Sequence, residues 1–232
     1  MKKKIFGVTL SFFFVALIMF LATPVLAATP GANKKVFFVH HSTGQIYWDN
    51  GMKTALNNNG YTGKAPWWDG GTDPIDFPTL FSDFNSWATF GNADIIIFKS
   101  CYPASAISSK AMLTQYKAWY KELFSVYNSH PNKLFVPMST PPLPKAMTNI
   151  NEANRAIKFN NWLATTYVAK YHEKYPSRTN LLPYQLHKKL MNDNGYLAAK
   201  YVANPYDGHP NAKSGTRVGN TLVNLLNNYF AN

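Results

Sequence analysis

The chain has 232 residues, 46% of them hydrophobic and 16% aromatic, so it can bury a sizeable core and is expected to form one domain. Lysine and arginine outnumber aspartate and glutamate by 23 to 11, but the lysines are scattered, which argues against a nucleic-acid partner. The positive charge would suit an anionic partner, such as an envelope polymer, or would simply favour solubility. The single cysteine, Cys101, excludes an internal disulfide.

The first residues have the pattern of an export signal. Three lysines, Lys2–Lys4, precede an apolar run from Ile5 to Leu21 and a small-residue site that ends at Ala27. This pattern predicts a signal peptide over residues 1–27, followed by a single domain over residues 28–232, and a secreted or periplasmic (extracytoplasmic) location. An uncleaved anchor is the alternative, but the proline and small residues favour cleavage. No other long apolar run follows, so no stable membrane span is expected after cleavage.

Short apolar runs alternate with helical patterns along the rest of the chain. The run Ala93–Phe98 is apolar almost throughout, which is typical of a central parallel strand that is covered on both faces. Strands are expected at about residues 34–40, 61–68, 93–98, 133–138 and 179–182. Helices are expected up to residue 58 and at about 109–127, 151–174, 185–191 and 212–229. The alternation predicts an α/β fold, a three-layer α/β/α sandwich with a mostly parallel sheet.

A reactive serine is expected directly after the first strand. The apolar residues 36–39 run into His40-His41-Ser42-Thr43-Gly44, where the apolar pattern ends. Open α/β sheets bind ligands beyond the carboxyl ends of their strands, so we interpret Ser42 as a candidate nucleophile. The structural alternative is that Ser42 caps the helix that follows.

The partners of this serine are expected near the other end of the chain. Asp207-Gly208-His209-Pro210-Asn211 precedes the last helix and can reach the same edge of the sheet. A serine hydroxyl needs a base to take its proton, and a carboxylate that fixes the tautomer of that base. His209 and Asp207 are the candidates for these two roles, although Asp-Gly is also an ordinary turn pair.

These two blocks resemble those of the SGNH (GDSL-like) hydrolase superfamily. The resemblance implies a flavodoxin-like fold and ester hydrolysis or acyl transfer without a metal or other cofactor. It also implies an oxyanion hole, in which Gly70 and the backbone N–H of Ser42 would take part. The family's asparagine is replaced here by the segment Lys99-Ser100-Cys101, so Ser100 or Lys99 would supply the remaining donor.

Other side chains are candidates for the wall of the pocket. His40 and His41 are adjacent on an extended segment and point to opposite faces, so no shared metal is expected and only one of them, His41, would line the pocket. Lys99 and Trp68 are the other candidates, since tryptophan faces near a rim suit sugar rings, although most tryptophans serve packing. Cys101 is a rival nucleophile, with a buried and inert thiol as the alternative.

The sequence as a whole predicts an exported serine ester hydrolase. An ester or an acetylated carbohydrate is the expected substrate, with an O-acetylated polysaccharide as the leading class. Two alternatives stay open. The protein could be a non-catalytic glycan-binding module on the same fold, or an acyltransferase that uses a sugar hydroxyl in place of water.

Overall fold

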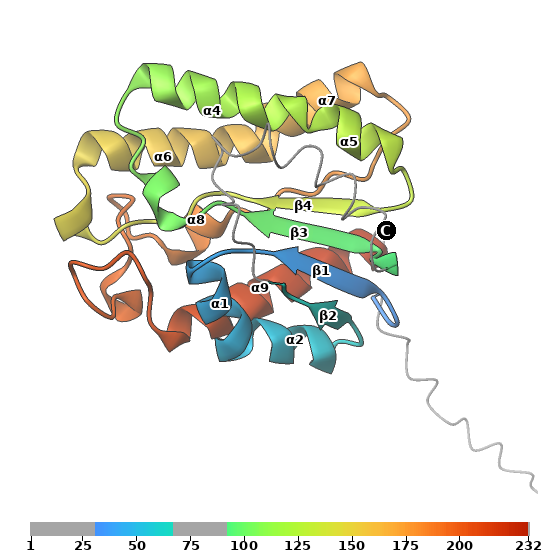
Figure 1. Cartoon of the computed structure of the whole chain (residues 1–232), viewed down its shortest axis with the longest axis horizontal. Coiled ribbons are helices and arrows are strands. Elements are labelled where there is room, and N and C mark those ends of the chain that lie inside the picture. Colours follow the sequence, from blue (N-terminus) through green and yellow to red (C-terminus); the bar gives the residue numbers. More distant parts are fainter. Residues whose placement is uncertain (1–30, 67–91, 232) are drawn as a thin grey trace, which may run out of the picture.

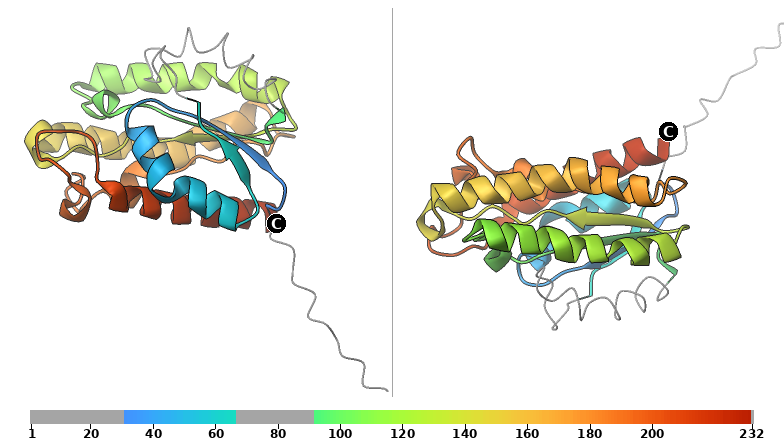
Figure 2. Two further views of the ribbon diagram at one scale, coloured as in Figure 1. Left: turned by 60° about the horizontal axis from the view of Figure 1, so that its bottom comes forward. Right: turned by 90° about the horizontal axis from the view of Figure 1, so that it is seen from above.

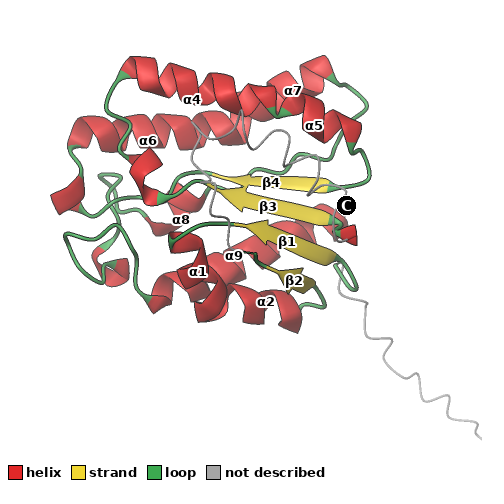
Figure 3. Cartoon of the chain, viewed as in Figure 1, coloured by secondary structure: helices red, strands yellow, loops and turns green. Residues whose placement is uncertain are grey.

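A computed structural model describes residues 31–66 and 92–231 of the chain. The predicted signal peptide therefore lies outside the described residues. Within them, the sheet has four parallel strands in the order β2-β1-β3-β4. The strands lie between two layers of helices, with all arrowheads pointing the same way (Figures 1 and 3). The strands are β1 (Lys35–Val39), β2 (Thr62–Lys64), β3 (Ile95–Lys99) and β4 (Leu134–Met138).

Helices cover both faces of the sheet, as the predicted three-layer sandwich requires. One layer contains α4 (Lys110–Glu122), α5 (Phe124–Ser129), α6 (Ile150–Trp162), the π-helical segment η6 (Leu163–Tyr167) and α7 (Val168–Lys174). The other layer contains α1 (Thr43–Tyr47), the kinked segment η1 (Trp48–Met52), α2 (Lys53–Asn58), α8 (Leu186–Leu190) and α9 (Ala212–Ala231). Figure 2 shows the first layer from above and, in its left view, α2 beside α9.

The strands are apolar on both faces because each face packs against its own layer. In β3, Ile95 and Ile97 belong to the core under α9, whereas Ile96 and Phe98 belong to the core under α4 and α6. Side chains alternate between the two faces of a strand, so a strand buried on both faces needs a continuous apolar run. This is why the sequence pattern located β3 so clearly.

The strand expected at residues 179–182 forms only two isolated parallel bridges to β4, at Leu181 and Tyr184. The ladder of hydrogen bonds is interrupted at Pro137 of β4, which has no N–H to donate between those of Phe135 and Ser139. This segment therefore extends the sheet beside β4, but it pairs only in part and does not form a regular fifth strand. Three short 3₁₀ segments complete the described chain: η4 (Tyr102–Ser105), η5 (Lys145–Met147) and η7 (Ala199–Tyr201).

The carboxyl ends of the strands define one rim of the molecule. In Figure 1 this rim is on the left, where the chain leaves β1 for α1 and where the orange-red loop leads into α9. No helix in residues 31–66 and 92–231 is both long enough and apolar enough to cross a membrane.

Candidate active site

Ser42 lies between the end of β1 and the start of α1, in a backbone conformation that is unusual for serine. Its φ is +46° and its ψ is −103°. The other two non-glycine residues with positive φ among those described are asparagines, which tolerate this region better. Ser42 occupies the N-cap position of α1, yet its side chain makes no capping hydrogen bond there. The helix-cap interpretation therefore does not account for Ser42, and its strained backbone is of the kind found at functional sites.

The glycine two residues further on is required by close packing against His40. A Cβ atom on Gly44 would lie 2.3 Å from the Cβ atom of His40, a distance that no real pair of side chains adopts. The chain can therefore turn from β1 into α1 directly after the serine only if residue 44 has no side chain. This explains the glycine of the His-His-Ser-Thr-Gly block in steric terms.

The hydroxyl of Ser42 is hydrogen-bonded to the ring of His209, 167 residues away. The contact joins Oγ of Ser42 to Nε2 of His209. On the other side of the ring, Nδ1 of His209 lies 2.5 Å from Oδ1 of Asp207. The same carboxylate oxygen accepts the backbone N–H of His209 at 3.0 Å. The spacing of one residue between Asp207 and His209 therefore allows a single carboxylate to hold both the backbone and the ring.

This chain of contacts fixes the proton positions. An ionised carboxylate can only accept hydrogen bonds, so Nδ1 of His209 carries a proton and Nε2 is left to accept the proton of Ser42. The hydrogen bonds from the backbone and ring of His209 hold the pKa of Asp207 below its usual value, which keeps the carboxylate ionised. The three side chains thus have the donors and acceptors of an activated serine.

The triad is open to solvent on one side. The side chains of His209 and Asp207 are 33% and 47% exposed to solvent, so a substrate can approach from the surface. His209 and Asp207 are held by the loop before α9: Val202 and Pro210 form an antiparallel bridge, and Asn211 N–H donates to the carbonyl of Tyr201 at 2.7 Å. These bonds make the loop a fixed support for the histidine.

A buried lysine reaches the chain beside Ser42. Lys99 ends β3 and is fully buried, and its Nζ donates to the carbonyl of His41 at 3.2 Å. Ser100 is also fully buried, and its hydroxyl has no hydrogen-bond partner among the described residues. Both residues are on the carboxyl edge of the sheet, as predicted. The predicted oxyanion residue Gly70 and pocket residue Trp68 lie outside the described residues.

The two adjacent histidines have different environments. His40 is buried, and its Nε2 lies 3.3 Å from the carbonyl of Ala65, whereas His41 is half-buried. Burial, with the nearby charge of Lys99, lowers the pKa of His40 to about 4, so this ring is neutral at pH 7. Of the two histidines, His40 is therefore the one that packs against backbone.

The described residues contain no group of three or more His, Cys, Asp or Glu side chains that could hold a metal ion. Cys101, the rival nucleophile, is buried. The ring of His209 is hydrogen-bonded to Ser42 and to Asp207, so the geometry favours the serine over the thiol.

One structural feature of the site has no signal in the sequence. The η1 segment after Ser42 crosses α9, the helix after His209, with almost no side chain between their backbones. A Cβ on Gly215 would lie 2.7 Å from the carbonyl oxygen of Asn50, and one on Gly219 would lie 2.8 Å from that of Gly51. The hydroxyl of Thr216 also donates to the Asn50 carbonyl at 3.2 Å. The elements that carry Ser42 and His209 are therefore in direct backbone contact.

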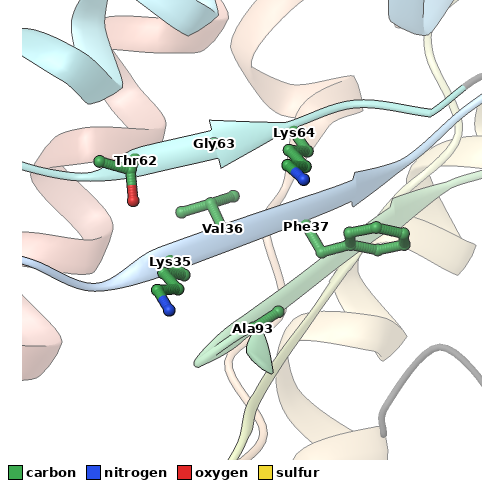
Figure 4. Close-up of a pocket in the computed structure, with 7 residues that line it drawn as sticks. All are labelled: Lys35, Val36, Phe37, Thr62, Gly63, Lys64 and Ala93. Carbon is green, nitrogen blue, oxygen red and sulfur yellow. The ribbon is translucent and has the colours of Figure 1, made fainter. Parts of the chain in front are cut away.

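A separate hollow of about 290 Å³ lies at the amino-terminal half of the sheet, away from the triad (Figure 4). Its walls come from β1, β2 and Ala93, the residue two before β3. The lining is Lys35, Val36, Phe37, Thr62, Gly63, Lys64 and Ala93. The lining contains no histidine and no carboxylate, so the hollow does not hold a second triad of the kind formed by Ser42, His209 and Asp207.

No family model and no curated protein matches the chain. Solved structures do match. A putative acylhydrolase from Bacteroides fragilis aligns at 13% identity with a TM-score of 0.53, over 85% of this chain and 86% of that one. A GDSL-like lipase from Bacteroides thetaiotaomicron aligns at 12% identity with a TM-score of 0.53, over 85% and 88%. A family two carbohydrate esterase from Clostridium thermocellum aligns at 12% identity with a TM-score of 0.51, over 86% and 65%.

These similarities define the fold of the chain. At such low identity they support the architecture alone, and that architecture is the α/β/α sandwich found in GDSL-like acylhydrolases and carbohydrate esterases. The predicted fold class is thereby confirmed.

Proposed function

We propose that the protein is a serine ester hydrolase that works by an acyl-enzyme mechanism, with Ser42 as nucleophile, His209 as base and Asp207 as the orienting acid. The single observation that carries the proposal is the continuous hydrogen-bonded chain from Ser42 Oγ through the ring of His209 to Asp207. Function depends on such a site more than on the fold, and the site consists of parts that lie 167 residues apart.

The proposed reaction has two steps. In the first, Ser42 Oγ attacks the ester carbonyl carbon while its proton passes to Nε2 of His209. The tetrahedral intermediate collapses, the alcohol leaves with that proton, and the acyl group stays on Ser42. In the second step His209 takes a proton from water as that water attacks the acyl-serine carbonyl. The tetrahedral intermediate collapses, His209 returns the proton to Oγ of Ser42, and the acid is released. Asp207 stabilises the imidazolium in both steps.

Negative charge develops on the carbonyl oxygen, so the site needs electrostatic stabilisation. The buried ammonium group of Lys99, bonded to the carbonyl of the residue next to Ser42, places a positive charge close to the reacting centre. Ser100 and the backbone N–H of Ser42 are the proposed donors, together with Gly70 as the sequence resemblance implies. This assignment is part of the proposal.

We further propose that the substrate is an O-acetylated polysaccharide outside the cytoplasm. The predicted signal peptide supports export, and the carbohydrate esterase among the structures of similar fold supports the substrate class. The intact Ser42–His209–Asp207 chain argues against a purely glycan-binding protein, since a binding module would have no need to keep it.

Turnover of p-nitrophenyl acetate tests the proposed activity. Ser42→Ala should lower kcat/KM by about 10³-fold or more, because the nucleophile is removed. Ser125→Ala is the matched control, since Ser125 is an exposed serine on α5, in the other helical layer. Equal rates for the wild type and Ser42→Ala would end the nucleophile assignment. If the hydroxyl groups of an added sugar accept the acetyl group faster than water does, the protein is a transferase instead.

A further inference from the structure

A cleft of about 560 Å³ lies between two loops of the carboxyl rim, one of which leads to Asp207 and His209. One wall comes from the segment after β4, around η5, and the other from the segment between α8 and α9. Its lining is Pro144, Lys145, Ala146, Asn192, Asn194, Tyr196, Leu197, Ala199, Val202 and Pro205. The volume is in the range of small-molecule binding sites, which is about 300–1,000 Å³.

The cleft shares a wall with the proposed catalytic residues. Val202 lines the cleft and pairs with Pro210, the residue after His209. Pro205 also lines it, and the backbone N–H of Asp207 donates to the carbonyl of Asn204 at 3.1 Å. A ligand in the cleft would therefore lie against the same loop that holds His209 and Asp207.

The walls are preformed. Leu197 N–H donates to the carbonyl of Leu143 at 2.8 Å, which joins one wall to the other at the base of the cleft. The side chain of Asn192 accepts the backbone N–H groups of Asn194 and Tyr196 at 3.0 and 3.1 Å and so fixes the turn between them. A preformed site loses less conformational entropy when it binds a ligand.

An exposed aromatic residue directly follows Pro205, one of the residues that line this cleft. Tyr206 follows Pro205 and precedes Asp207, and it is 78% exposed. Among the described residues, Ile150 is the only other large apolar residue that is exposed. The backbone of Tyr206 is fixed, because its N–H donates to the side chain of Asn204 at 3.0 Å. An exposed aromatic ring between a residue that lines the cleft and Asp207 in sequence suits the apolar face of a sugar ring.

We propose that this cleft, together with Tyr206, binds the sugar units that flank the acetylated one. Lys145 and Asn194 are exposed at the cleft and would donate to sugar hydroxyls, and Tyr206 would pack on a ring. The cleft is lined by amide, ammonium and apolar groups, which together can bind the hydroxyls and the apolar faces of a sugar chain. This inference rests on the proposed esterase function and names the part of the substrate that is not hydrolysed.

The test compares a substrate that fills the cleft with one that does not. Chemically acetylated xylo-, cello- and chito-hexasaccharides extend beyond the reacting ester, whereas p-nitrophenyl acetate lacks a sugar chain. Tyr206→Ala should raise KM for the hexasaccharide that the wild type hydrolyses best by about three- to tenfold, the usual size of an aromatic contact, with kcat nearly unchanged. Tyr206→Trp should restore the KM, and neither variant should change p-nitrophenyl acetate turnover.

Ile150→Ala is the matched control, because Ile150 is 47% exposed but does not line the cleft. It should leave both substrates unaffected. If Tyr206→Ala, Lys145→Ala and Asn194→Ala all leave KM for the hexasaccharides unchanged, the cleft assignment is wrong. The same holds if the wild type hydrolyses p-nitrophenyl acetate but no acetylated hexasaccharide.

Binding to Ser42→Ala separates this inference from the catalytic proposal. Calorimetric titration of Ser42→Ala with the deacetylated hexasaccharides measures the cleft without any turnover. Binding that is weakened by Tyr206→Ala supports the cleft even if the wild type proves inactive on every ester. Activity on p-nitrophenyl acetate without hexasaccharide binding keeps the esterase and rejects the cleft.

Discussion

The two helical layers are held to the same sheet in different ways. The layer of α4–α7 packs through large aromatic side chains. The rings of Phe159 and Tyr120 pack edge to face with 5.1 Å between their centroids, and the hydroxyl of Tyr167 donates to the Tyr120 carbonyl. The layer of α1, η1, α2 and α9 contains the crossing at Gly215 and Gly219, where backbones touch. Only the second layer adjoins Ser42 and His209 directly.

The two helical layers therefore have different roles. Aromatic packing buries much apolar area and contributes mainly stability, and it tolerates small shifts. Direct backbone contact fixes the distance between two helices with little freedom, because no side chain can adjust between them. The proposed nucleophile and base come from segments joined in this second way, so the crossing is a positioning device for the pair Ser42 and His209.

Truncating an aromatic residue of the first layer should lower stability without changing the site. Phe159 is fully buried, and Phe159→Ala should cost about 3–5 kcal/mol of unfolding free energy. The turnover number per folded molecule should stay near that of the wild type. Urea unfolding and kinetics on the folded fraction measure the two quantities. A large loss of turnover with full folding would show that the first layer also positions the triad.

Filling the glycine crossing should affect both stability and activity. In Gly219→Ala the new methyl group would meet the carbonyl of Gly51 at 2.8 Å, so the helices must move apart. Overpacking of this kind costs about 1–3 kcal/mol, and the movement should lower kcat/KM for p-nitrophenyl acetate by about tenfold.

The matched control for the crossing is Asn220→Ala, at the next position on α9, where the side chain is exposed. It should change stability by less than about 0.5 kcal/mol and leave turnover unchanged. If Gly219→Ala loses stability but keeps full activity in the folded fraction, the crossing does not position the triad.

Mild acid should weaken the layer that carries the site. His40 and His187 are buried there, and burial lowers the pKa of each from 6.5 to about 4. Between these values the unfolded chain binds protons that the folded chain does not, so stability falls as the pH falls from 6.5 towards 4. The urea midpoint should be lower at about pH 5 than at about pH 7 and unchanged between about pH 7 and 8. A midpoint that stays constant or rises at about pH 5 would contradict the buried, neutral state of these rings.

The sequence predicted much of the fold because its strands are buried on both faces. Ile95, Ile96 and Ile97 face alternate layers, and a continuous apolar run is the pattern of such a strand. Leu181 and Tyr184 were harder to place, since Pro137 interrupts the pairing of their segment with β4. The carboxyl rim followed from the parallel topology, which brought Ser42 and His209 into contact as their blocks had suggested.

The remaining features depend on partners that a single sequence does not reveal. Gly215 and Gly219 look like poor helix residues until η1 is seen to touch them. The close contact between Lys99 and the carbonyl of His41 depends on the pairing of β1 with β3. The cleft at Tyr206 forms between two loops far apart in sequence, so no local pattern predicts it.

Covalent labelling tests the central claim most directly. A fluorophosphonate reacts with a serine only when a neighbouring base activates it, and peptide mass spectrometry locates the adduct. The structure predicts one adduct on Ser42 in the wild type, a strongly reduced one in His209→Ala, and normal labelling in His130→Gln, whose ring bonds only to the backbone of α5. Absence of an adduct, an adduct on another residue, or full labelling of Ser42 in His209→Ala would contradict the account.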